Sequence, residues 1–182
     1  MTPDAFHRQV AWLLAEQVRI VSVEELLRLD DRIDAAALTF DDGFASMQSE
    51  VVPVLRDHRL PATCFIVTGQ VGGDNRWGGR SSPGIPTLPL LDWDDLARLR
   101  DAGVALGGHT RTHPWLPALG PAELDREVIE CADEIRRRLG GTLVRHTTYR
   151  AVAAGGCERP GGGGEVRWCR PRRRSPRPRG RR

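Results

Sequence analysis

Ala35-Ala-Ala-Leu-Thr-Phe40 is a short apolar run, and Asp41-Asp42-Gly43 follows it directly. A run of this length between polar segments is typical of a strand buried in a sheet, and a glycine after it allows a sharp turn. Two adjacent carboxylates are costly at the end of a buried strand unless positive charge compensates them, and a bound cation is the simplest compensation. By itself, Asp-Asp-Gly is also common in ordinary surface turns. The stretch therefore predicts a buried strand followed by a turn that is either an ordinary surface turn or a cation site.

A second polar motif, Gly107-Gly108-His109-Thr110-Arg111-Thr112-His113-Pro114, follows another short apolar run. Two histidines four residues apart lie on one face of a helical turn, which suits two nitrogen ligands of one metal ion. Pro114 disfavours the α conformation at His113, so we expect the turn to end there. Thr110 can hold the turn by bonding backbone groups. A lone pair of histidines often lies in an exposed loop, but two such motifs at strand ends favour one shared metal site.

Apolar strands alternate with amphipathic helices along the chain. The predicted strands are 18–23, 35–40, 61–68 and 104–108, and the predicted helices are 4–16, a short one capped by Ser22, 45–58, 92–102 and 121–139. Residues 69–91 are rich in Gly, Pro and Ser, which predicts a long surface loop. The alternation predicts an α/β fold with a parallel sheet, doubly wound or closed into a barrel, whose functional residues lie at the carboxyl ends of the strands.

The 27 basic residues are all Arg, and their distribution divides the chain. Residues 1–150 carry 17 Arg and 22 acidic residues, a net charge of −5, whereas residues 151–182 carry 10 Arg and 2 Glu, a net charge of +8. The second segment is too poor in apolar residues to form a core, so we expect one domain over 1–150 and a disordered tail over 151–182. The tail composition fits out-of-frame translation of a GC-rich gene, a plain basic tail or a nucleic-acid arm. Its one aromatic residue, Trp168, disfavours the last of these.

Three further features bound the location and chemistry of the protein. There is no run of 18 apolar residues, so no membrane-spanning helix is predicted. The first residues lack the basic-then-apolar pattern of a secretory signal, which predicts a cytoplasmic location. Cys64 and Cys131 fall in apolar patterns without metal-finger spacing, so we expect small core residues rather than disulfides.

Together, Thr39-Phe-Asp-Asp-Gly43 and His109-Thr-x-x-His-Pro114 resemble the motifs of the polysaccharide deacetylase family, the NodB-homology domain of carbohydrate esterase family 4. Segments 61–67, 91–96 and 99–103 also resemble sequences that members of this family carry at the same places, and the resemblance covers roughly residues 5–149. It implies an incomplete, distorted (β/α) barrel. It also implies a hydrolase that removes N-acetyl groups from a polysaccharide or oligosaccharide by metal-activated water.

The resemblance assigns roles to individual residues. It implies that Asp42, His109 and His113 hold a divalent metal, usually zinc, and that Asp41 is the general base. Three protein ligands leave a position for water, whose pKa zinc lowers toward about 7. Two histidines and one carboxylate also suit non-haem iron, but the deacetylase-like surroundings argue against an oxygenase.

Supporting roles follow for other residues near the motifs. Gly43 and Thr110 are expected to support the metal site, and Trp115 is expected to line the substrate-binding site. The substrate is an N-acetylated glycan, with chitin oligomers, poly-N-acetylglucosamine and peptidoglycan all open. A glycosidase with paired carboxylates is disfavoured, because adjacent aspartates can hardly flank a bond at the ~5–9 Å separation that such chemistry needs.

The sequence departs from the family after the second motif. Family members have an Arg- and Pro-containing strand whose following segment donates an N–H to the oxyanion, and a later Leu-x-x-His that supplies the general acid. Residues 144–149 begin like that strand, with Tyr149 as the candidate oxyanion residue, but residues 151–182 contain no His. We therefore expect a C-terminally truncated or frameshifted domain of low stability and weak activity. The alternative is an inactive metal-binding remnant that lacks the general acid.

Overall fold

The computed structural model describes residues 2–30, 32–81 and 83–140 of the chain. Within these ranges, three strands form a parallel sheet in the order β3-β4-β5, and β1 and β2 form a separate parallel pair. The strands are β1 Arg19–Ile20, β2 Ala35–Ala36, β3 Leu38–Phe40, β4 Ala62–Ile66 and β5 Ala105–Gly108. Helices connect the paired strands, as parallel pairing requires. The predicted α/β architecture is confirmed.

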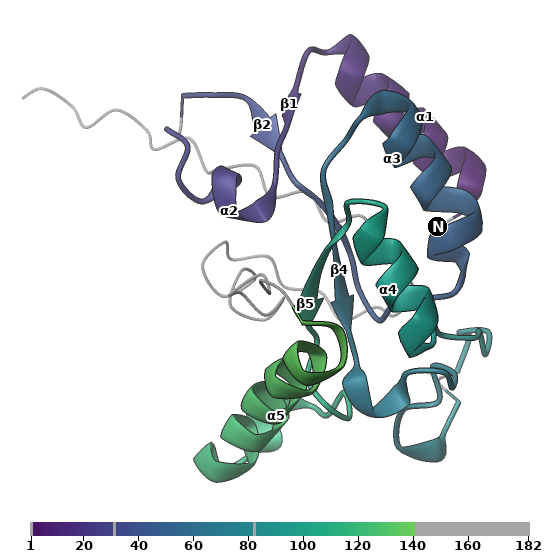
Figure 1. Cartoon of the computed structure of the whole chain (residues 1–182), viewed down its shortest axis with the longest axis vertical. Coiled ribbons are helices and arrows are strands. Elements are labelled where there is room, and N and C mark those ends of the chain that lie inside the picture. The colour runs from purple at the N-terminus through teal and green to yellow at the C-terminus, as the bar shows by residue number, and fades with distance from the viewer. Residues whose placement is uncertain (1, 31, 82, 141–182) are drawn as a thin grey trace, which may run out of the picture.

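Five α-helices accompany the described strands: α1 Pro3–Ala15, α2 Val23–Leu26, α3 Val52–His58, α4 Trp93–Asp101 and α5 Pro121–Leu139. Local capping explains where several of them begin. The Ser22 hydroxyl accepts the Glu25 N–H at 3.1 Å, and Asp92 and Asp95 form a reciprocal capping box at the start of α4. In Figure 1, α1, α3 and α4 lie to one side of β4 and β5, and α5 extends from the lower end of the strands.

The hydrophobic core lies between the three-stranded sheet and its helices. All five residues of β4 are buried, and Phe6 of α1 packs edge-on against Phe40 of β3 with ring centroids 5.6 Å apart. Cys64 and Cys131 are fully buried free thiols. Burial raises the pKa of the Cys64 thiol, so this residue stays protonated and unreactive. The prediction of small core cysteines is confirmed.

Three local predictions are wrong in detail. The run 35–40 is not one strand, because it breaks at Ala37 and its halves pair with different partners. The helix expected over 45–58 begins as a π-helix, Met47–Val51, before α3. The helical apolar pattern of 121–139 predicts that Leu124 faces the core together with Cys131 and Ile135, but Leu124 is 37% exposed whereas the other two are buried.

The long loop between β4 and α4 is more ordered than its composition indicates. It contains 3-10 turns at Thr68–Gln70 and Trp77–Gly79 and two single antiparallel bridges, Phe44 to Leu90 and Asp74 to Pro89. A backbone bond connects its end to residues 41–43, which we call the aspartate turn: the Leu91 N–H donates to the Gly43 carbonyl at 2.8 Å. The loop is therefore part of the wall around the carboxyl ends of the strands.

Some predictions fall on residues that the structure does not describe. They are the strand over 144–149 with Tyr149, the tail over 151–182 and the domain division between them. All three stay predictions. Among the described residues, no helix is both long and apolar enough to cross a membrane.

Candidate metal centre

The two polar motifs lie at the carboxyl ends of β3 and β5, the strands that flank β4. Asp41 to Gly43 follow Phe40, the last residue of β3, and His109 follows Gly108, the last residue of β5. Parallel strands end at the same edge of a sheet, so the two motifs meet across the end of β4. The position of the motifs agrees with the sequence prediction.

The three predicted metal ligands converge. Asp42 Oδ1 lies 3.4 Å from His109 Nε2 and 3.6 Å from His113 Nε2, and one ligand atom from each residue lies within 4.8 Å of the others. A tetrahedral zinc ion about 2.0 Å from each ligand atom places those atoms roughly 3.3 Å apart. The spacing of this group therefore fits a small divalent cation.

The environment of Asp42 also fits a cation. Its Oδ1 is buried and accepts no hydrogen bond within the described residues. Burial, together with the negative charge of Asp41, raises the pKa of Asp42 from 3.8 to about 7. Burial also lowers the pKa of His113, which favours the neutral imidazole that binds metals. A buried carboxylate beside another carboxylate is unfavourable alone, and a divalent ion would offset both charges.

The segment 109–113, which we call the histidine loop, is not helical. Thr110 and His113 have positive φ values of 70° and 60°. The prediction that a helical turn presents both histidines on one face is therefore wrong. The loop instead bends at Arg111 and Thr112. The Thr110 hydroxyl accepts the His113 N–H at 3.0 Å, which holds the end of the loop. Thr110 is fully buried and supports the loop as predicted, by a different geometry.

Two glycines allow neighbouring segments to approach this loop. A Cβ at Gly69 would lie 2.6 Å from the carbonyl oxygen of Arg111, to which the Gly69 N–H donates at 2.8 Å. A Cβ at Gly108 would lie 2.9 Å from the Cys131 sulfur on α5. Side chains at either position would displace the loop, so these glycines set how closely β4 and α5 pack around it.

Glu127 of α5 holds the histidine loop from the other side, and the sequence analysis missed it. Its carboxylate accepts the N–H groups of Arg111 and Thr112, each at 2.8 Å, and the Thr112 hydroxyl at 2.7 Å. These bonds satisfy backbone donors that a non-helical loop leaves unpaired. Helical spacing from Cys131 places Glu127 near the buried face of α5, but nothing in the sequence identifies its partner.

Two tryptophans lie close to His113 in space or in sequence. The Trp77 indole stacks on the His113 imidazole with ring centroids 4.4 Å apart and an interplanar angle of 26°. Trp115 is 71% exposed, and its predicted contact with substrate stays a prediction. Trp93 packs against the core, with the Arg138 guanidinium over its ring.

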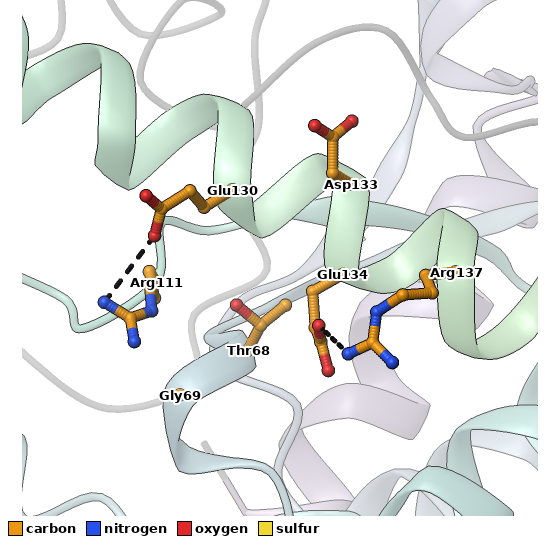
Figure 2. Close-up of a pocket in the computed structure, with 7 residues that line it drawn as sticks. All are labelled: Thr68, Gly69, Arg111, Glu130, Asp133, Glu134 and Arg137. Carbon is orange, nitrogen blue, oxygen red and sulfur yellow. Dashed lines mark hydrogen bonds and ion pairs between the residues drawn. The ribbon is translucent and has the colours of Figure 1, made fainter.

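A charged cleft lies beside the histidine loop, with a volume of about 490 Å³. It is lined by Thr68, Gly69, Arg111, Glu130, Asp133, Glu134 and Arg137. Figure 2 shows ion pairs within this lining, Arg111 with Glu130 and Arg137 with Glu134. None of the seven lining residues is a predicted metal ligand. The cleft is therefore a neighbour of the metal centre and separate from it.

Comparison with known proteins identifies the family. A model of the family described as polysaccharide deacetylase matches residues 29–154, more than half of the chain. The chain belongs to the polysaccharide deacetylase family. The matched range contains the aspartate turn, the histidine loop and Glu127, so the resemblance read from the two motifs is confirmed.

Curated members of the polysaccharide deacetylase family align with part of this chain. A chitooligosaccharide deacetylase from Sinorhizobium fredii is 34% identical over 110 residues, which is 60% of this chain and 43% of the relative. A poly-beta-1,6-N-acetyl-D-glucosamine N-deacetylase from Staphylococcus epidermidis is 25% identical over 79 residues, 41% of this chain and 27% of the relative. The chain thus spans less than half the length of these relatives.

Solved deacetylase structures have the same fold. The Streptococcus pyogenes deacetylase PplD superposes with a TM-score of 0.62 at 22% identity, covering 78% of this chain and 60% of PplD. IcaB from Ammonifex degensii gives a TM-score of 0.62 at 21% identity, covering 79% of this chain and 64% of IcaB. These matches confirm the predicted deacetylase-type α/β fold.

Proposed function

We propose that this chain carries the metal-binding half of an N-deacetylase site that hydrolyses the acetamide group of an N-acetylated glycan. The observation that carries the proposal is the approach of Asp42 Oδ1 to both His109 Nε2 and His113 Nε2 at 3.4 and 3.6 Å. Membership of the polysaccharide deacetylase family supports the reaction class. These two observations together favour hydrolysis over simple metal storage, because the family is one of deacetylases and the three candidate ligands suit a single metal ion.

Asp42, His109 and His113 would hold the metal, and zinc is the ion that best suits two nitrogens and one oxygen at this spacing. A bound zinc ion would supply Lewis-acid chemistry, since it acidifies water and stabilises negative charge on a carbonyl oxygen. The raised pKa of Asp42 shows that its buried negative charge lacks compensation, and a bound cation would favour the ionised carboxylate. Neutral His113 offers its Nε2 lone pair without first losing a proton.

Asp41 is the proposed general base. It precedes Asp42 in the same turn, and its charge is close enough to raise the pKa of Asp42. Its carboxylate would take a proton from the water that attacks the acetyl carbonyl carbon. The carbon–nitrogen bond then breaks, acetate leaves, and the sugar nitrogen must gain a proton to depart as an amine. We assign the general acid that protonates this nitrogen to no residue of the described chain.

The proposed substrate class is an oligosaccharide or polysaccharide of N-acetylglucosamine. The names of the relatives, chitooligosaccharide deacetylase and poly-beta-1,6-N-acetyl-D-glucosamine N-deacetylase, support this class and differ in the sugar linkage. The acetamide group is common to both polymers and is what the proposed site would act on. Trp115 is exposed and follows the histidine loop after Pro114, and its proposed role is to stack on a sugar ring next to the reacting one.

Acetate release from chitin oligomers and from poly-β-1,6-N-acetylglucosamine tests this function. We expect zinc-dependent release by the wild-type chain and a loss of at least about 100-fold in Asp41→Asn, with zinc still bound. Asp57→Asn, which neutralises an exposed aspartate of α3, is the matched control and should keep wild-type activity. Zinc binding without acetate release from either polymer would favour the metal-binding remnant, and the absence of both would contradict the proposal.

A further inference from the structure

His113 is the more exposed of the two histidines in the metal centre. Its side chain is 25% exposed, compared with 7% for His109, and its backbone has a φ of 60°. A non-glycine residue in this conformation is strained and needs support from its surroundings. The Thr110 hydroxyl supports its backbone, but the ring itself needs a separate restraint.

Trp77 supplies that restraint from the long loop. Its indole and the His113 imidazole are nearly parallel, with centroids 4.4 Å apart. Such stacked contact fixes the tilt of the smaller ring and covers one of its faces. The His109 ring is also close, with its centroid 5.0 Å from that of His113. The His113 ring therefore contacts both another proposed metal ligand and an indole.

The loop is built so that Trp77 stays in this position. Asn75, two residues earlier, is 6% exposed and bonds to the opposite side of the loop three times. Its amide donates to the Pro86 carbonyl at 3.0 Å, its side-chain oxygen accepts the Leu88 N–H at 2.8 Å, and its own N–H donates to the Leu88 carbonyl at 3.3 Å. A buried and satisfied asparagine of this kind fixes a loop that has no regular secondary structure.

We infer that Trp77 is a positioning residue for the metal centre: it holds the His113 imidazole toward Asp42 and His109 and shields one face of that ring from water. The inference rests on the proposed metal site. It adds a role for the 69–91 loop, which would act as a preformed wall of the site. It assigns no direct contact between Trp77 and the reacting atoms.

The size of the expected effect follows from the contact. Loss of a stacked aromatic pair should weaken the binding of a metal to His113 by about three- to tenfold. A ring without nitrogen, such as Phe, keeps most of the stacking and should restore most of the affinity. A side chain of similar bulk without a ring, such as Leu, should not restore it.

The test is the zinc affinity of the full chain, measured by competition with a chelating dye, in wild type, Trp77→Ala, Trp77→Leu and Trp77→Phe. We expect about three- to tenfold weaker binding in the first two variants and near-wild-type binding in Trp77→Phe. Trp115→Ala is the matched control: it removes an exposed indole two residues after His113, and its zinc affinity should be unchanged. The melting temperature of each zinc-free variant identifies a variant that fails to fold, and Trp77→Leu then replaces Trp77→Ala.

Two results would overturn the inference. One is a folded Trp77→Ala or Trp77→Leu chain with wild-type zinc affinity, and the other is an equal loss in Trp115→Ala. If the wild-type chain itself binds no zinc, it is the proposed metal site that fails, and this outcome is distinct because it appears before any variant is compared.

Discussion

The carboxylate of Glu127 on α5 makes two hydrogen bonds with Thr112, one to its backbone N–H at 2.8 Å and one to its hydroxyl at 2.7 Å. This contact joins the longest helix of the described chain to the loop that carries both histidines. Because the loop is not helical, the N–H groups of Arg111 and Thr112 have no backbone partner among the described residues, and the Glu127 carboxylate accepts both. The position of the metal ligands therefore depends on the packing of α5 against β5.

Glu127→Ala should lower both the stability of the chain and its metal affinity. Three hydrogen bonds to one carboxylate are lost, so we expect a decrease of about 1.5–3 kcal/mol in the free energy of unfolding and weaker zinc binding. Urea denaturation and a zinc titration measure the two effects. Glu130→Ala is the control, because among the described residues the Glu130 carboxylate makes a single long ion pair, 3.6 Å from Arg111 on the surface. Equal effects of the two substitutions would contradict this role for Glu127.

Gly69→Ala should destabilise the chain by about 1–3 kcal/mol, because its Cβ would lie 2.6 Å from the Arg111 carbonyl oxygen, a backbone atom that cannot move without shifting the histidine loop. Thermal unfolding measures this. At Gly120, which precedes α5, the nearest atom to an added Cβ is 3.7 Å away, and serine is a favourable residue before a helix. Gly120→Ser should therefore leave the melting temperature nearly unchanged. A stable Gly69→Ala variant would show that the loop can move away freely.

The stability of the metal-free chain should depend on pH through Asp42. Its pKa is raised from 3.8 to about 7, so the stabilising contribution of the protonated carboxyl is fully present below pH 3.8 and is lost as pH rises through about 7. The difference corresponds to roughly 4 kcal/mol. Asp42→Asn removes this dependence, so the variant should gain stability relative to wild type between pH 4 and 8 without metal. Urea denaturation in chelator across this range measures the difference, and a constant difference would contradict the assignment.

A divalent ion should oppose that pH dependence. Binding to the folded chain alone adds about 2.7 kcal/mol of stability at a free ion concentration 100 times the dissociation constant. The gain should be larger at pH 8 than at pH 5, because the ion competes with protons for Asp42 and for the histidines. The melting temperature with zinc and with a chelator at the two pH values measures this, and a gain independent of pH would place the bound zinc elsewhere.

The sequence predicted the regular elements because each carries its own local signals. Residues 121–139 begin after Gly120 with a proline, follow a helical apolar pattern and end at a glycine, and α5 has these bounds. Asp92 caps α4, as its position before the apolar pattern indicates. The three ligand residues could be predicted because the ends of parallel strands meet at one edge, whatever the detailed shape of the loops.

The conformations of the loops could not be predicted in the same way. Thr110 and His113 have positive φ in a loop that is held by bonds to Glu127 and Gly69, which are distant in sequence and give no periodic signal. Trp77 lies in a loop without alternation or helical spacing, and its contact with His113 depends on the burial of Asn75. Tertiary contacts of this kind become visible only when the chain is folded.

The most direct test of the account is a calorimetric titration of zinc into the metal-free chain at pH 8, alongside Asp42→Asn, His113→Gln and the control His58→Gln, which alters an exposed histidine of α3. We expect one zinc ion per chain in wild type and His58→Gln. We also expect at least about 100-fold weaker binding in Asp42→Asn and His113→Gln, since each removes one of three ligands. Zinc binding of wild-type strength in either ligand variant would contradict the metal centre at the ends of β3 and β5.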